Sequence, residues 1–137
     1  MSGYILDTDT WIEFFRRRSG IGTHIRQTPK DEIFASEVSL AELTYGALHS
    51  QNVDMHMREP RIIQENFKVM PLVDGWYNDY AEIRQSVVSK GYTVGDFDII
   101  IGATARRFGL TVVTHNIKHF SLMPGVKCVD WVNPPEQ

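Results

Sequence analysis

The stretch Tyr4-Ile5-Leu6-Asp7-Thr8-Asp9-Thr10 places three apolar residues directly before two carboxylates that a single residue separates. A short apolar run bounded by turn-forming residues is typical of a buried strand. In a parallel sheet, Asp7 then lies at the carboxyl end of the strand, where open α/β sheets bind their ligands. Two carboxylates about 4 Å apart repel each other by ~4 kcal/mol in a protein-like dielectric. A cation, a proton or a wide separation must relieve that repulsion, unless Asp7 or Asp9 only makes an Asx turn or caps the next helix.

The composition predicts one ordinary globular domain over residues 1–137. Of these residues 42% are hydrophobic and 23% are charged, as is usual for soluble domains. We see no secretory signal pattern and no apolar run long enough to cross a bilayer. The lone cysteine, Cys128, excludes an internal disulfide and favours a reducing, cytoplasmic location.

The charge is unevenly distributed along the chain. The formal net charge of the chain is −3. Without five acids that could share one pocket, the rest of the chain carries +2. Those five are Asp7, Asp9, Glu42, Asp96 and Asp98. The remaining basic residues are candidates for contacts with nucleic-acid phosphates, although each cluster could equally be a solvated helix face. They are Arg16-Arg17-Arg18, Arg58, Arg61, Arg106-Arg107 and Lys118.

Short apolar runs alternate with helical patterns along the whole chain. Strands are expected over residues 4–6, 33–36, 69–72, 110–113 and 126–129. Helices are expected from Trp11 to the arginine run and over 23–27, from Ser39 onward, over 60–67 and 74–90, and from Asp96 or Asp98 to Gly109, with a helical turn at 117–120. Residues 50–59 are expected to form a loop, and the tail 133–137 to fray. This alternation predicts a three-layer α/β/α sandwich around a central, mainly parallel sheet of about five strands.

The acids fall at junctions on one edge of this predicted sheet. Asp7 follows the first strand, Glu42 is expected in the first turn of the helix after the second strand, and Asn116 follows the fourth strand. Each has a structural alternative: Ser39 and Glu42 fit a capping box, Asp98 could be an N-cap, and Asn116 could cap the next turn. Their convergence on one edge favours a site.

The ligand types at this edge suit a hard cation. Carboxylate oxygens without a His or Cys partner set favour Mg²⁺ or Mn²⁺ over zinc, and the five histidines show no tight ligand spacing. One or two such ions could bridge the carboxylates and a phosphodiester, activate a water molecule and stabilise the leaving oxygen. No protein nucleophile is then needed.

Four motifs in register resemble the PIN domain, and their order and spacing resemble the VapC-type toxins of bacterial toxin–antitoxin pairs. They are Ile5-Leu6-Asp7-Thr8-Asp9, Ser36-Glu37-Val38-Ser39-Leu40-Ala41-Glu42-Leu43, Gly95-Asp96-Phe97-Asp98 with Ile101-Gly102-Ala103-Thr104-Ala105, and Leu110-Thr111-Val112-Val113-Thr114-His115-Asn116 with Phe120. Together they extend over nearly the whole chain.

This resemblance implies a Mg²⁺- or Mn²⁺-dependent endoribonuclease. Its catalytic and metal-binding acids would be Asp7, Glu42 and Asp98, with Asn116, Asp96 and Asp9 as further candidate ligands. Thr8 and Thr114 match the small polar positions that orient the acids. Two departures from the family pattern affect the fourth ligand: Asp9 replaces an asparagine, and His119 stands where many members carry an acid.

The resemblance also implies partners. The substrate would be RNA, and a small cognate antitoxin would restrain the enzyme, in a homodimer or a toxin–antitoxin hetero-oligomer without a membrane. Four aromatic residues near the first and third helices are expected to form the apolar surface that the partner buries, although core packing could also explain them. They are Trp11, Phe14, Phe15 and Tyr45.

Two other functions stay open. Asp7-Thr8-Asp9-Thr10 also resembles the start of haloacid-dehalogenase-type phosphotransferases, with Asp7 as nucleophile, Asp9 as general acid, Gly95-Asp96-Phe97-Asp98 as the late acidic motif and Lys90 upstream. The departure at His119 instead allows a non-catalytic PIN-like binding module. A trapped phospho-aspartyl intermediate would identify the phosphotransferase.

Overall fold

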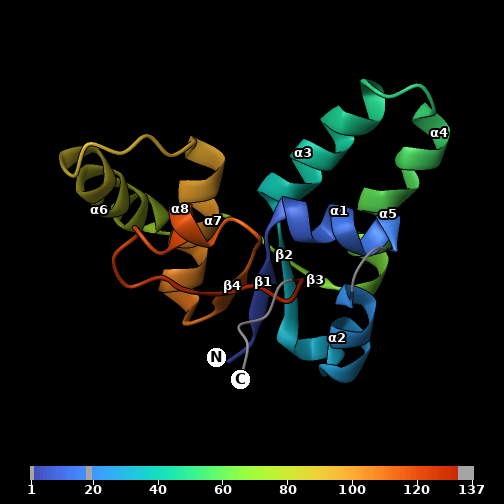
Figure 1. Ribbon diagram of the computed structural model, residues 1–137, viewed down its shortest axis with the longest axis horizontal. Coiled ribbons are helices and arrows are strands. Elements are labelled where there is room, and N and C mark those ends of the chain that lie inside the picture. The colour runs from blue at the N-terminus through green and yellow to red at the C-terminus, as the bar shows by residue number, and fades with distance from the viewer. Residues whose placement is uncertain (1, 18–19, 133–137) are drawn as a thin grey trace.

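The computed structural model describes residues 2–17 and 20–132. In these ranges a single sheet runs through the middle of the molecule, with helices packed on both of its faces (Figure 1). The strands are β1 (Tyr4–Leu6), β2 (Ile33–Ser36), β3 (Lys68–Met70), β4 (Thr111–Val113) and β5 (Lys127–Val129). The helices are α1 (Thr8–Arg16), α2 (Ile21–Gln27), α3 (Glu37–Leu48), α4 (Val53–His56), α5 (Arg58–Asn66), α6 (Trp76–Ser89), α7 (Asp96–Phe108) and α8 (Ile117–Phe120), with a 3₁₀ turn at Lys30–Glu32.

All strand pairs in the sheet are parallel, and the strand order is β3-β2-β1-β4-β5. The chain builds outward from β1 to β3 and then crosses to the other side of β1 to form β4 and β5. The junction between β1 and β4 is therefore the topological switch point of the sheet, where open α/β folds bind ligands. The predicted three-layer α/β/α sandwich is confirmed.

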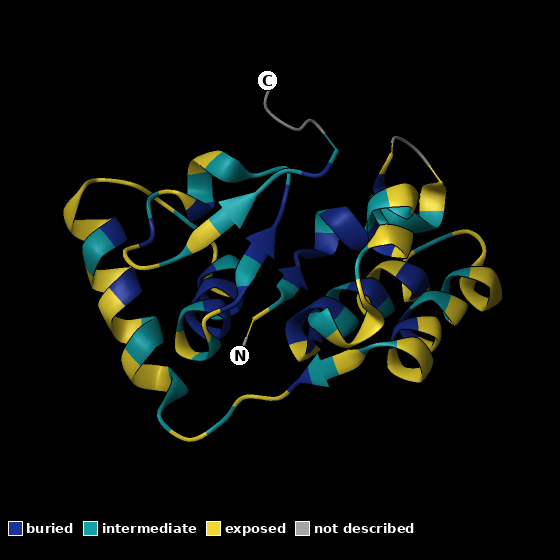
Figure 2. Ribbon diagram, turned by 90° about the horizontal axis from the view of Figure 1, so that it is seen from below, coloured by how far each residue is buried: buried dark blue, intermediate teal, exposed yellow. Residues whose placement is uncertain are grey.

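Strand alternation divides the core into two layers. Ile5, Phe34 and Val112 face the layer built by α6, α7 and α8. Their strand neighbours, among them Leu6 and Val113, face the layer built by α1, α2, α3 and α5. Figure 2 shows the buried residues concentrated in the strands and on the inner sides of the helices. No helix in the described ranges has the length and apolar character that crossing a bilayer requires.

Several predicted boundaries are wrong. Residues 50–59 are not a loop, because Asn52 caps α4 and α5 already begins at Arg58. The strand predicted over 69–72 covers 68–70, and α2 begins at residue 21 instead of 23. Leu48, the last residue of α3, is 64% exposed. The tail 133–137 and Arg18 lie outside the described residues.

The structure decides which residues cap the helices. Helix α1 begins one residue after β1, and its N-cap is Asp7, one of the two caps that the sequence allows. Helix α3 begins at once after β2, with Ser36 as the N-cap, so the capping box from Ser39 does not form. Asp98 is the third residue of α7, whose N-cap is Gly95, and it makes no cap hydrogen bond.

Candidate active site

Asp7 lies at the centre of the switch point, between the end of β1 and the start of α1. Its backbone amide extends the ladder to β4 by donating to the Val113 carbonyl at 2.9 Å. One carboxylate oxygen accepts the Thr8 amide at 2.8 Å, and the other accepts the Thr114 hydroxyl at 2.9 Å. The residue is only 5% exposed. Asp7 is therefore a helix cap, and it is also a carboxylate held from two elements inside the protein.

The surroundings of Asp7 in the folded protein disfavour the ionised form of its carboxylate. Burial first, and then the charges of Asp9 and Asp98, raise the pKa of Asp7 from 3.8 to about 7, against the hydrogen bonds from Thr114 and Thr8 that lower it. The influence of Asp9 and Asp98 shows that acids from α1 and α7 lie near the end of β1. Such a group of like charges at a buried position is typical of a functional site.

Glu42 reaches the same region from α3. It lies in the second turn of that helix and not in the first, because α3 begins at Glu37. The Thr8 hydroxyl donates to its Oε1 at 2.7 Å. Burial, and after it the charges of Asp98 and Asp9, raise the pKa of Glu42. The predicted supporting role of Thr8 thus corresponds to a direct contact with a candidate ligand.

Ser39 is a site residue that the sequence did not single out in this role. Its side chain is fully buried, and its hydroxyl lies 2.9 Å from that of Thr8. Because the single Thr8 hydroxyl hydrogen is given to Glu42, Ser39 is the donor of this second bond. The spacing from Ser39 to Glu42, three residues apart on one helix face, was the available signal, but it also fits a capping box.

The end of β4 closes the site from the other side. The Thr114 hydroxyl, which donates to Asp7, accepts the backbone amide of Asn116 at 2.9 Å. The backbone amide of His115 lies 3.3 Å from an oxygen of Asp9, and burial raises the pKa of Asp9. Asp9 therefore belongs to this edge, and Thr114 connects Asp7 to the loop that carries Asn116.

Asp96 does not join this group. Its carboxylate accepts the Tyr80 hydroxyl at 2.7 Å and lies 3.7 Å from Arg84, both on α6. Asp98 on α7 is half-buried, and its Oδ2 atom lies 3.5 Å from Nδ1 of His119. The structure therefore brings Asp7, Asp9, Glu42 and Asp98 to one edge and directs the side chain of Asp96 to α6.

The basic candidates divide into two sets. Arg106 and Arg107 form ion pairs with Asp79 on α6, and Arg106 also contacts Glu82, so these arginines hold helices together instead of facing a phosphate. Arg16, Arg17 and Arg58 line the groove described next, and Arg61 is exposed on α5. Lys118 is exposed on α8.

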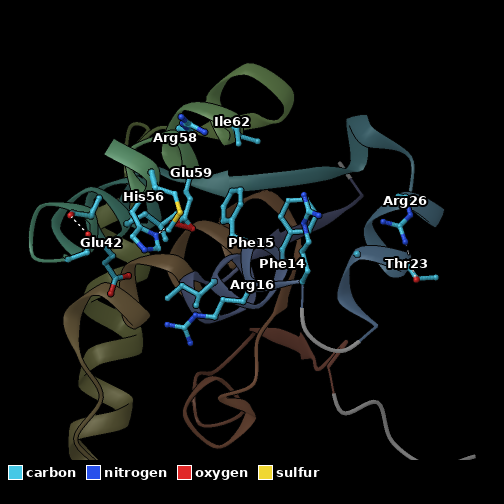
Figure 3. A pocket seen from close by; sticks show the side chains of 18 residues that line it. Phe14, Phe15, Arg16, Thr23, Arg26, Glu42, His56, Arg58, Glu59 and Ile62 are labelled. Atoms are coloured by element: carbon cyan, nitrogen blue, oxygen red, sulfur yellow. Dashed lines mark hydrogen bonds and ion pairs between the residues drawn. The ribbon is translucent and has the colours of Figure 1, made fainter. Parts of the chain in front are cut away.

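A groove of about 890 Å³ opens beside Glu42 between α1, α2, α3, α4 and α5 (Figure 3). Its apolar lining includes Phe14, Phe15 and Ile62, and its rim is basic. The rim arginines are Arg16, Arg17, Arg26 and Arg58. Trp11 is fully buried beneath it, so it belongs to the core and not to a partner surface, while Tyr45 is 68% exposed on α3.

The profile of the PIN domain matches residues 4–125. The chain therefore belongs to the PIN-domain family. Two relatives match almost the entire chain. The tRNA(fMet)-specific endonuclease VapC of Salmonella typhimurium is 28% identical over 134 residues (96% of this chain, 99% of the relative). Ribonuclease VapC1 of Haemophilus influenzae is 27% identical over 130 residues (93% and 97%).

A solved structure of the same class superimposes closely. In the crystal structure of DNA-bound VapBC from Salmonella typhimurium, the matching chain has a TM-score of 0.88 at 27% identity, with 96% of this chain and 99% of that chain covered. The resemblance to the PIN family that the four sequence motifs predicted is thereby confirmed.

Proposed function

We propose that this protein is a divalent-metal-dependent endoribonuclease that acts as the toxin of a toxin–antitoxin pair. The observation that carries the proposal is the carboxylate of Asp7 at the switch point, whose pKa is raised to about 7 by burial first and then by the charges of Asp9 and Asp98. Membership of the PIN family and the ribonuclease relatives support it. The working unit is a single PIN-like domain over residues 1–137, acting in the cytoplasm.

The residues present fit a hard divalent cation. Asp7, Glu42 and Asp98 offer carboxylate oxygens, which Mg²⁺ and Mn²⁺ prefer, and Asp9 and Asn116 lie at the same edge. Burial and mutual repulsion raise the pKa of Asp7 and Glu42, so a positive charge at this place would favour their ionised forms. In the described ranges no three acidic, His or Cys side chains already form a metal cage, so an ion shared by three of them would have to draw them closer.

In this mechanism Asp7, Glu42 and Asp98 hold Mg²⁺ or Mn²⁺, which when bound makes water a stronger nucleophile and stabilises charge on the phosphodiester. Thr114 fixes one oxygen of Asp7, and Thr8 fixes one oxygen of Glu42. Arg16, Arg17 and Lys118 are exposed cations for the RNA backbone, and Arg18 is a fourth candidate outside the described residues.

Asp7 is poorly placed for the alternative role of a phosphotransferase nucleophile. Both of its oxygens already accept hydrogen bonds, from Thr8 and Thr114, and the residue is buried. These two bonds fix the orientation of the carboxylate, whereas a nucleophilic carboxylate must turn an oxygen in line with the phosphorus atom. Each oxygen keeps a further lone pair that a cation can use, so the arrangement favours Asp7 as a fixed ligand.

The antitoxin would occupy the groove beside Glu42. Its apolar lining with Phe14 and Phe15 suits the apolar face of a short helix, and its position beside the acids would let a basic partner side chain approach them. The Salmonella and Rickettsia structural relatives are VapBC complexes bound to DNA. We expect a hetero-oligomer with a small antitoxin, built on one toxin chain or on a homodimer.

The test is incubation of the purified protein with a total RNA pool that includes tRNA, in Mg²⁺, Mn²⁺ or chelator, followed by mapping of the cut ends. We expect discrete cuts that disappear in chelator and in Asp7→Asn. The matched control is Asp54→Asn, which removes the same charge from an exposed position of α4 and should cut like the parent. Undiminished cleavage by Asp7→Asn in excess chelator would refute the proposal.

A further inference from the structure

His119 extends from the short helix α8 toward the candidate metal site. The helix is anchored by its neighbour Phe120, which is fully buried in the core, and by Asn116, whose carbonyl accepts the backbone amides of His119 and Phe120 at 3.1 and 3.3 Å. The His119 side chain itself is 41% exposed. Its backbone position is thus fixed by the fold, while its ring is not needed to fill the core.

The His119 ring contacts two candidate ligands through one nitrogen. Its Nδ1 lies 2.7 Å from the Asn116 side-chain amide nitrogen and 3.5 Å from Oδ2 of Asp98. In the first contact the amide donates, so Nδ1 carries its lone pair on this side of the ring. A lone pair on an imidazole nitrogen is the form in which histidine binds metals.

The separation of these atoms suits two ligands of one ion. Metal–ligand bonds of about 2.1 Å at a right angle place the two donor atoms about 3.0 Å apart. The observed 3.5 Å between Nδ1 and Oδ2 is within a small side-chain rotation of that value. The Asn116 amide would release Nδ1 by turning, which the part-buried Asn116 and His119 side chains can do without repacking the core.

The other four histidines have different neighbours. His24 stacks on Trp131, and His49 stacks on Tyr45. His56 pairs with Glu59, three residues further along the chain in the groove lining. His115 is the nearest rival because its backbone amide contacts Asp9, but the Nδ1 atom of its ring lies 3.4 Å from Asp130.

We propose that His119 supplies a nitrogen ligand beside Asp98, and that the site therefore prefers a first-row transition ion to Mg²⁺. Imidazole suits transition ions, whereas Mg²⁺ takes oxygen ligands almost alone. Mn²⁺ is the ion of this row that best accepts a majority of carboxylates, so we use it as the probe. The inference rests on the proposed function, and it makes His119 a specificity-determining residue in place of a missing fourth acid.

The test measures binding and coordination without any RNA. The full-length protein is stripped with chelator and loaded with substoichiometric Mn²⁺. Continuous-wave electron paramagnetic resonance gives the free Mn²⁺ and hence the affinity, competition gives the Mg²⁺ affinity, and electron spin-echo modulation detects a directly bound ¹⁴N nucleus. The variants are His119→Gln, His119→Asp and, as the matched control at the same sheet edge, His115→Gln.

We expect ¹⁴N modulation in the parent and in His115→Gln, and none in His119→Gln or His119→Asp. Loss of the nitrogen ligand should weaken Mn²⁺ binding by at least the roughly tenfold that loss of an outer-shell partner costs, and should change Mg²⁺ binding far less. His119→Asp should narrow the preference for Mn²⁺ by strengthening Mg²⁺ binding. In chelator, the melting temperatures of the His119 variants should stay within a few degrees of that of the parent, because the side chain is half-exposed. This measurement separates ligand loss from misfolding.

Two results would overturn the inference alone: Mn²⁺ bound to the parent without ¹⁴N modulation, or modulation that persists in His119→Gln. A different result would overturn the proposed function and the inference together. That result is a parent that binds neither Mn²⁺ nor Mg²⁺, or one whose binding is unchanged by Asp98→Asn.

Discussion

Replacing Asp7 with asparagine should make the metal-free protein more stable at neutral and alkaline pH. Asparagine and aspartate are nearly equal N-caps, so the amide oxygen can keep the 2.8 Å bond from the Thr8 amide. What Asp7→Asn removes is a buried negative charge near Asp9 and Asp98, together with the acceptor of the Thr114 hydroxyl, whose loss offsets part of the gain. The same change takes away a proposed metal ligand, so stability and activity should move in opposite directions, as is common at functional sites.

The size of the effect follows from the pKa of Asp7, which burial raises from 3.8 to about 7. The folded protein binds this proton more tightly than the unfolded chain does. The resulting stabilisation is complete below pH ~3.8 and is lost as the pH rises to ~7, with a full span of ~4 kcal/mol. Between pH 5 and pH 8 the parent should lose ~2–3 kcal/mol from this group, which for a chain of 137 residues is about 9 °C in melting temperature.

The assay is a series of thermal melts in chelator from pH 5 to pH 8. We expect the melting temperature of Asp7→Asn, taken relative to the parent, to rise with pH by an amount of this order. Asp54→Asn, at an exposed position on α4, should follow the parent at every pH. Parallel curves for parent and Asp7→Asn would refute the reasoning, because the charged form of Asp7 would then carry no penalty in the folded protein.

Three further outcomes test the assignments. Asp98→Asn should leave the metal-free fold intact, since Asp98 makes no cap hydrogen bond, yet reduce Mg²⁺-dependent stabilisation in melts and RNA cleavage by orders of magnitude. Thr114→Val should destabilise by ~1–3 kcal/mol in denaturant titrations, because it leaves buried partners including Asp7 unsatisfied, whereas Thr114→Ser should not. Arg106→Ala should lower the free energy of unfolding by about 1 kcal/mol, because it breaks the partly buried pair with Asp79. RNA cleavage should stay at the parental rate, because an arginine that pairs with Asp79 does not contact the RNA phosphates.

The sequence could predict the layers of the fold because each strand is a short apolar run next to turn-forming residues. It could also predict that Asp7 and Asn116 share an edge, because the carboxyl ends of parallel strands lie together. The helices over residues 50–59 were missed for a physical reason. Helix α4 is four residues long with no buried residue, so it has no apolar periodicity, and only its Asn52 cap signals it.

The starts of helices and the partners of charges were the harder part. Ser36 and Ser39 both precede helix-forming residues, and only the end of β2 at Ser36 decides which of them is the cap. The arginine pair at 106–107 could bind a phosphate or an acid, and the choice depends on Asp79, which is 27 residues away in sequence from Arg106. Pairings between distant elements follow from packing, which local sequence patterns do not contain.

Capping and metal binding are not competing explanations for Asp7, because one carboxylate can do both. The distinction lies in what each role requires. A cap needs one acceptor oxygen, which an asparagine or a serine supplies without a charge. Asp7 instead carries a second hydrogen bond, from Thr114, lies 5% exposed, and has two acids near enough to raise its pKa. Burial and the two acids destabilise the ionised form, the Thr114 bond offsets only part of that penalty, and none of the three adds anything to the start of α1. The environment of ionised Asp7 therefore destabilises the folded protein more than helix capping requires. A divalent cation bound among these acids would offset that penalty.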